Sequence, residues 1–122
     1  MIFWLILSLV LVALAAGCNA VMDVTMFKFD KSVFKTDNEK WNRWWSDRSH
    51  RFWIIQLNDG WHHFKMWMVF FLILAVLSHA HHKYFWDSWN ITLLIEFVFY
   101  ALAWNLSFNF CYDHLFIRKE KQ

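Results

Sequence analysis

Histidine is the residue type in this sequence best suited to metal or proton chemistry, and five of the seven histidines fall in two clusters. Three of them form an H-x-H-H pattern, namely His79, His81 and His82. His79 and His82 are three positions apart and therefore share one face of a helix, where two imidazoles could reach one Zn²⁺ or Cu²⁺. A metal site uses three or four protein ligands, so we favour a polar helix end over a metal site. No cofactor is expected, and a divalent metal at this cluster is the alternative.

Glu96 is the only carboxylate inside a predicted membrane span. An ionisable group in lipid costs about 2.5 kcal/mol or more, which makes such a residue a functional candidate by default. Tyr100 follows one helical turn later, while Asn105 and Asn109 lie roughly on the opposite face and are expected to hydrogen-bond across helices. Alternatively, Glu96 is protonated and bonds Tyr100 or another helix, or it reaches outward to the headgroups.

No sequence pattern identifies a catalytic nucleophile. The chain contains no C-x-x-C, G-x-S-x-G, H-E-x-x-H or phosphate-loop motif. Cys18 and Cys111 both fall near the cytoplasmic ends of predicted spans, where thiols stay reduced. We therefore predict no catalytic residues, and the chain is more readily explained as a protein that is not an enzyme.

The composition places these residues in a membrane protein. The 122 residues are 59% apolar, 22% aromatic and 18% charged, whereas soluble domains average roughly 45–50% apolar and about 25% charged residues. The length allows a single domain. The net charge of +2 is too small to indicate a nucleic-acid partner.

Three apolar stretches are each long enough for a membrane-spanning helix, which needs about 20 residues. They cover about residues 1–22, 61–80 and 91–112. We expect an all-α integral membrane protein, because backbone groups in lipid need internal hydrogen bonds. The first stretch could instead be a cleaved signal peptide or a lipoprotein leader. No positively charged segment precedes it, so a retained helix is favoured.

The basic residues predict the orientation. Ten Lys and Arg residues fall in the loop 23–60 and the tail 113–122, and one falls in the loop 81–90. Cytoplasmic loops carry the excess of basic residues. We predict that the N-terminus lies outside and the C-terminus in the cytoplasm, in a bacterial inner membrane.

The aromatic residues of the loop 23–60 recur with helical spacing. Five side chains at i, i+3, i+4, i+7 and i+11 share one face, and these are Trp41, Trp44, Trp45, Arg48 and Phe52. This face predicts an amphipathic helix over about residues 39–56 that lies at the inner interface. Alternatively, the aromatic rings pack against the spans. Asn58 or Asp59 is expected to cap the second span.

Small residues recur along the first span at four-residue spacing. They form two interleaved pairs, Ala13 with Gly17 and Ala16 with Ala20. Small residues let helix backbones approach closely in lipid, so this face is expected to pack on another helix. The pattern fits a helix of this chain or of a second chain.

Three short motifs resemble a known group of sequences. They are N-A-V-M-D at 19–23, S-V-F at 32–34 and D-G-W-H-H-F-K at 59–65. Together they resemble a group of uncharacterised small membrane proteins of Bacteroidota and their phages, over roughly residues 15–66. The resemblance implies a small inner-membrane protein and implies no activity.

These observations favour a small integral membrane protein that acts by helix packing, as an oligomer or as an accessory subunit. The expected partners are the lipid bilayer and either a second copy or another membrane protein. A metal-binding or redox protein that uses the outer histidine cluster is the first alternative. A phage-type holin-like protein is the second.

Overall fold

Three long helices make up most of the computed structural model. It describes residues 2–46, 60–84 and 90–118, except for the side chains of residues 46, 81–84 and 90–94. The three long helices are α1 (Ile2–Phe27), α3 (Gly60–Tyr84) and α4 (Asn90–Asn109). The shorter elements are the 3₁₀ turn η1 (Phe29–Lys31), α2 (Glu39–Ser46) and the π-helical turn η2 (Phe110–Leu115), which continues α4. The predicted all-α fold class is confirmed.

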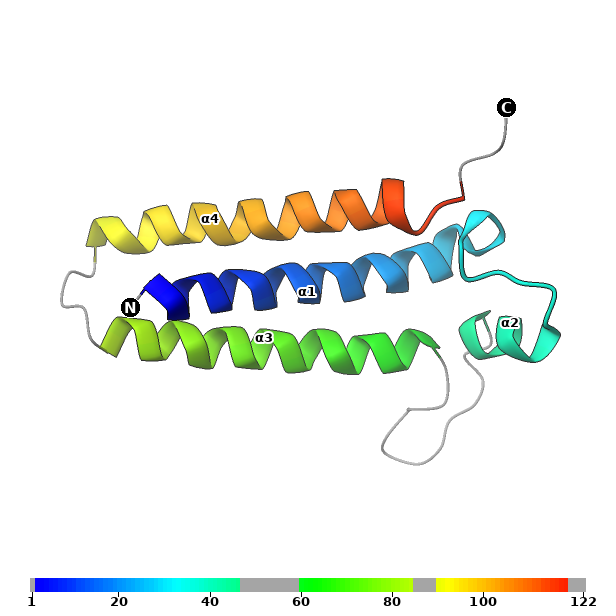
Figure 1. The fold of residues 1–122 in the computed structure, drawn as a ribbon, viewed down its shortest axis with the longest axis horizontal. Helices are drawn as coiled ribbons and strands as arrows, with labels where there is room; N and C mark the ends of the chain where they lie inside the picture. The colour runs from blue at the N-terminus through cyan, green and yellow to red at the C-terminus, as the bar shows by residue number, and fades with distance from the viewer. Residues whose placement is uncertain (1, 47–59, 85–89, 119–122) are drawn as a thin grey trace.

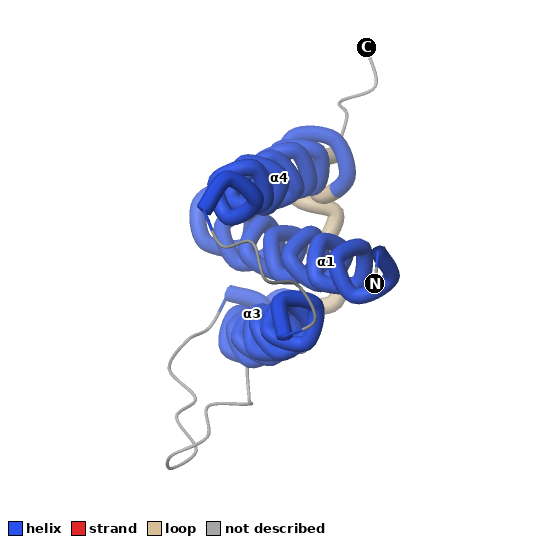
Figure 2. The backbone as a smooth tube through the Cα atoms, turned by 90° about the vertical axis from the view of Figure 1, so that its left-hand side faces the viewer, coloured by secondary structure: helices blue, strands red, loops and turns tan. Residues whose placement is uncertain are grey.

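Helix α1 is the central helix of the bundle. It packs against both α3 and α4, and Figure 1 shows that α3 runs antiparallel to the other two. The end-on view in Figure 2 places α3 and α4 on opposite sides of α1. As a result, the first turns of α1 lie at the same end of the bundle as the last turns of α3 and the first turns of α4.

Small side chains allow this central position. Ala16 and Ala20 are completely buried, and Ala13 and Gly17 are half-buried. A methyl group added at Gly17 would lie 3.7 Å from the Sγ atom of Cys111 in η2. The small-residue face predicted from the sequence therefore packs inside this chain.

Two helices, Ile2–Phe27 and the first part of α3, Gly60–Ala80, are long and apolar enough to cross a membrane. They match the first two predicted spans, although α1 continues five residues beyond the predicted end at residue 22. Val24 and Thr25 in this extension are buried, so packing rather than apolar length sets where the helix ends. A helix also occupies the third predicted span.

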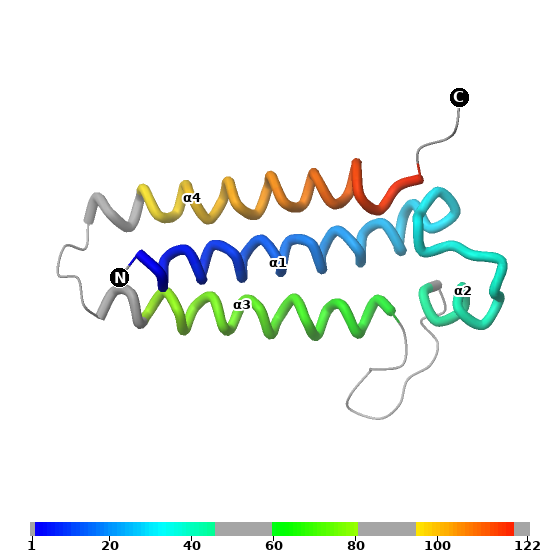
Figure 3. The backbone as a smooth tube through the Cα atoms, viewed as in Figure 1, coloured from blue at the N-terminus to red at the C-terminus, as the bar shows by residue number. Residues whose placement is uncertain are grey.

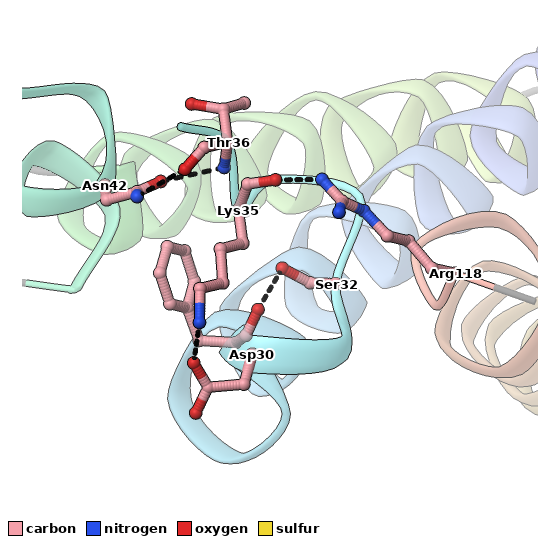
Figure 4. A network of polar contacts seen from close by, with 7 residues as sticks. Asp30, Ser32, Lys35, Thr36, Asn42 and Arg118 are labelled. Carbon is pink, nitrogen blue, oxygen red and sulfur yellow. Dashed lines mark hydrogen bonds and ion pairs between the residues drawn. The ribbon is translucent and has the colours of Figure 1, made fainter. Parts of the chain in front are cut away.

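The C-terminal segment is tied to the turn that follows α1. Ser32 and Ile117 form an antiparallel β-bridge, with Val33 N–H donating to the Phe116 carbonyl at 2.8 Å. Figure 3 shows this segment beside the turn after α1, and Figure 4 shows the polar contacts around it. The Arg118 guanidinium donates to the Lys35 carbonyl. The far end of α4 is therefore held at the same end of the bundle as the far end of α1.

Helix α2 begins where the sequence predicts and packs on α3. Asn38 caps it, because its Oδ1 accepts the Trp41 N–H at 3.2 Å. Residues 47–56 of the predicted helix, with Arg48 and Phe52, lie outside the described residues, as do the predicted caps Asn58 and Asp59.

The aromatic rings of α2 do not share one environment. Trp45 is 4% exposed; its ring packs against Phe34 in a tilted arrangement and stacks on Phe64, with ring centroids 4.4 and 5.6 Å away. Trp41 is 44% exposed and stacks on Trp44. The indole ring of Trp45 therefore packs against α3, as in the alternative interpretation, while the interfacial position of α2 stays a prediction.

Candidate functional site

Four polar side chains from the three long helices meet inside the bundle. They are Ser8 of α1, His79 of α3, and Glu96 and Tyr100 of α4, and we call them the polar cluster. Ser8 is completely buried and Glu96 is 7% exposed. Ser8 lies six residues into α1, or roughly 9 Å from its start. Glu96 and Tyr100 are four positions apart, so they present one face of α4 to the other helices.

A chain of hydrogen bonds runs through the polar cluster in one direction. Ser8 Oγ donates to the Leu5 carbonyl at 2.8 Å, and it also lies 2.6 Å from the Tyr100 hydroxyl. A serine hydroxyl has one proton, so with that proton on the Leu5 carbonyl Ser8 accepts the Tyr100 proton. The Tyr100 oxygen in turn lies 2.9 Å from Nδ1 of His79, and in this arrangement it accepts a proton from Nδ1.

With the Ser8 proton on the Leu5 carbonyl, this direction gives His79 a protonated Nδ1. Nδ1 carries a proton because the Tyr100 hydroxyl has already donated its own to Ser8. In the neutral imidazole, Nε2 is then the hydrogen-bond acceptor. Nε2 lies 3.7 Å from Oε2 of Glu96. This distance allows electrostatic attraction to a protonated ring, and it is too long for a direct hydrogen bond.

An apolar cavity of about 350 Å³ opens beside the polar cluster, between α3 and α4. His79, Glu96 and Tyr100 form its polar end. The remaining walls are aliphatic or aromatic, and they are Val12, Leu72, Ala75, Val76 and Phe97. We call this cavity the α3–α4 groove.

The polar cluster does not have the arrangement of a hydrolase site. Ser8 is fully buried and gives its proton to the backbone of its own helix, so no base is placed to activate its hydroxyl. Its hydrogen bond runs to tyrosine rather than to histidine. Ser8 is therefore a structural acceptor.

The described residues contain no group of three His, Cys, Asp or Glu side chains able to hold a metal ion. His79 and Glu96 come together, but they supply two ligands, and a zinc site uses three or four. The side chains of His81 and His82 lie outside the described residues. Of the three histidines in the predicted metal cluster, the structure therefore describes the side chain of His79 alone.

The structure brings some of the predicted polar residues together and separates others. Glu96 and Tyr100 both line the groove. Asn105 is exposed, and its Nδ2 donates to the Ala101 carbonyl of its own helix at 2.8 Å, so its bond to another helix stays a prediction. Asn109 is exposed. Ser8 was not predicted, although it is the only polar side chain in the first 16 residues.

The opposite end of the bundle carries positive charge. Lys28 lies over the Tyr112 ring at 4.2 Å and Lys65 lies over the Trp61 ring at 5.1 Å. These cations lie at the end of α1 and the start of α3, the end that also holds η1, α2 and the segment after η2. The described parts of the basic loop and tail therefore meet at one end. The thiols of Cys18 and Cys111 are free.

No protein-family model, curated protein sequence or solved structure matches the chain.

Proposed function

We propose that the chain is an integral membrane protein of a bacterial inner membrane. The observation that carries this proposal is the apolar outer surface of α3 and α4. Large exposed side chains line both helices and include Phe70, Ile73, Val76, Leu77, Phe97, Val98, Leu102 and Leu106. Soluble monomers rarely expose apolar patches of this extent, whereas lipid chains solvate them at no cost.

The same surface argues against a soluble helical core. In α3, only 11% of the apolar window is fully buried within the bundle, so many of its large apolar side chains stay exposed on the described chain. A core helix of a soluble domain would be covered by its neighbours. Lipid chains are the simplest environment that would contact the exposed apolar side chains of α3 and α4.

Three spans with the N-terminus outside are part of the proposal. Helix α4 has 20 residues and is about 30 Å long, which matches the hydrocarbon core. The bridge between Ser32 and Ile117 supports a third span, because it holds the end of α4 beside the loop that follows α1. The basic residues gathered at this end favour the cytoplasmic side.

We further propose that the protein acts by helix packing, as an oligomer or as an accessory subunit of another membrane protein. Helices in lipid associate through close packing and hydrogen bonds, and the exposed faces of α3 and α4 leave room for such contacts. Native mass spectrometry from a mild detergent and from lipid nanodiscs tests this. We expect a discrete homo-oligomer or a stoichiometric partner, and a monomer in both media would contradict the proposal.

Metal binding is the second candidate, and one observation favours it. His79 and Glu96 come from different helices and face each other at 3.7 Å, with Nδ1 of His79 held by Tyr100 as metal-binding histidines are commonly held. Elemental analysis of protein without a polyhistidine tag tests it. Near-stoichiometric metal that disappears when His79, His81 and His82 are all replaced by Asn would make metal binding the leading function.

A further inference from the structure

We propose that a second copy of this chain docks on the outer face of α4, and that the two copies pair their Asn105 amides across a two-fold axis. The contact surface is a line of exposed side chains that we call the α4 seam, made of Ile95, Val98, Leu102, Asn105 and Asn109. This inference rests on the membrane location and the helix packing proposed above. It adds to them the identity of the partner and the surface that meets it.

The α4 seam has the spacing of a helix–helix contact. Its members follow one another at alternating steps of three and four residues, which is the repeat that keeps a stripe of side chains against a second helix. Ile95, Val98 and Leu102 are each about half exposed, at 49%, 50% and 49%, and the two asparagines are exposed as well. The seam therefore offers an uninterrupted contact surface along α4.

The α4 seam faces away from the rest of the bundle. Glu96 is buried and Tyr100 is half-buried, and both point towards the other long helices. Helix α4 packs against α1, and Figure 2 shows α3 on the far side of α1. The described part of the chain therefore leaves the seam uncovered.

Asn105 makes lipid a poor cover for this surface. It lies seven residues before the end of the predicted span at residue 112, which is roughly 10 Å inside the hydrocarbon core. Its short side chain cannot reach the headgroups from that depth. Lipid chains offer neither donors nor acceptors, so an amide exposed to them is unfavourable. A polar residue in this position is typical of a helix that pairs with another helix.

The exposed face of α3 has a different character. Between residues 69 and 77 its exposed side chains are all apolar, namely Val69, Phe70, Ile73, Val76 and Leu77. Lipid chains solvate such a face without loss. The position of the amide therefore selects α4, rather than α3, as the surface that needs a protein partner.

The chemistry of the amide selects a second copy as that partner. Nδ2 of Asn105 donates one N–H to the Ala101 carbonyl at 2.8 Å, which leaves its second N–H and Oδ1 to bond a group outside the bundle. Two copies in one membrane have the same orientation, so a two-fold axis along the bilayer normal places each seam residue opposite its own counterpart. Each Asn105 then donates to Oδ1 of the other, and the donors and acceptors match by symmetry. A paired asparagine also fixes the register of two helices.

Cross-linking of single cysteines in native membranes maps the contact. Cys18 and Cys111 are replaced by Ala, and cysteine is introduced in turn at Val98, Leu102 and Phe97. Phe97 is the matched control, because it is 70% exposed but lies about 120° around α4 from the middle of the seam. A disulfide needs two Cα atoms within about 7 Å, so mild oxidation should give a covalent dimer at 98 and 102 and not at 97.

Substitution of Asn105 measures the amide pair. The dissociation constant of the dimer is obtained from energy transfer between labelled copies of the full chain at increasing detergent. An interhelical hydrogen bond in a membrane is worth a factor of about three on average, so Asn105→Leu, which removes two, should raise the constant by about eightfold. Asn105→Gln keeps an amide and should restore part of the affinity. Asn109→Leu removes an amide closer to the headgroups, where water competes, and should change the constant by less than about threefold.

Several results would overturn the inference. A covalent dimer that forms as readily at 97 as at 98 and 102 would do so, as would a dissociation constant that Asn105→Leu leaves unchanged while helicity is retained. A dimer that cross-links through Val76→Cys of α3, or a different protein seated on α4, would also overturn it and would leave the proposed helix packing intact. A monomer in both detergent and nanodiscs would contradict the helix packing itself, so the two proposals fail by different outcomes.

Discussion

Replacing Tyr100 by Phe removes one hydroxyl group that links all three long helices. That hydroxyl bonds Ser8 of α1 at 2.6 Å and His79 of α3 at 2.9 Å. Hydrogen bonds between helices in a membrane average about 0.6 kcal/mol each and reach about 1.7 kcal/mol. The variant should therefore lose about 1.2 kcal/mol of unfolding free energy from the two bonds, and up to about 3 kcal/mol if both are strong.

The loss is measured by reversible unfolding in mixed micelles, with helicity followed as the denaturing detergent is increased. A double-mutant cycle with Ser8→Ala isolates one of the two bonds and should give a coupling of about 0.6 kcal/mol. Tyr112→Phe is the matched control, because it also removes a tyrosine hydroxyl, near the other end of the bundle. The Tyr112 ring contacts Lys28 through its face, and the substitution keeps that face. The control should change stability by less than about 0.5 kcal/mol.

The tautomer of His79 gives an independent readout of the same prediction. In the unmodified protein, ¹⁵N shifts of the imidazole should report the proton on Nδ1. This preference should weaken in Tyr100→Phe, because the acceptor for that proton is gone. The reasoning is refuted if Ser8→Ala and Tyr100→Phe are additive, or if the ¹⁵N shifts show the proton on Nε2 in the unmodified protein.

Two further predictions concern the opposite end of the bundle. Gly60→Ala should destabilise the fold by about 1–3 kcal/mol, because the added methyl group would overlap the buried Trp45 ring. Thermal unfolding with near-ultraviolet circular dichroism measures this, and a variant as stable as the parent would contradict the packing. Asn38→Ala should weaken α2 by about 1 kcal/mol through loss of its N-cap. Hydrogen exchange at the Trp41 amide should become faster by roughly fivefold, and an unchanged rate would show that the cap does not hold α2.

The sequence predicts the elements well because their signals are local. Apolar length and helical spacing indicate the three long helices, and the four-residue spacing of Glu96 and Tyr100 indicates that they share a face. The helical spacing of the aromatic residues predicts a helix from about residue 39, where α2 begins, and the structure adds Asn38 as its cap.

The polar cluster could be predicted only in part, because its formation depends on how the helices are rotated. Ser8 is a single hydroxyl in an apolar run, and nothing local shows that it meets Tyr100, 92 residues away. From the sequence, His79 looks like a solvated residue at a helix end. In the structure, the packing of α3 against α1 turns its side chain towards α4. The Trp45 ring is likewise buried because it packs against Gly60, which lies 15 residues further along the chain.

The membrane topology is tested most directly by labelling single cysteines with an impermeant thiol reagent on intact cells. The native Cys18 and Cys111 are replaced by Ala, and cysteine is introduced in turn at Ile2, Thr36 and Leu115, all of which are exposed on the described chain. We expect labelling at position 2 in intact cells, and labelling at 36 and 115 only after the membrane is opened. Labelling of position 36 in intact cells would contradict the orientation, and labelling at 115 but not 36 would contradict a third span.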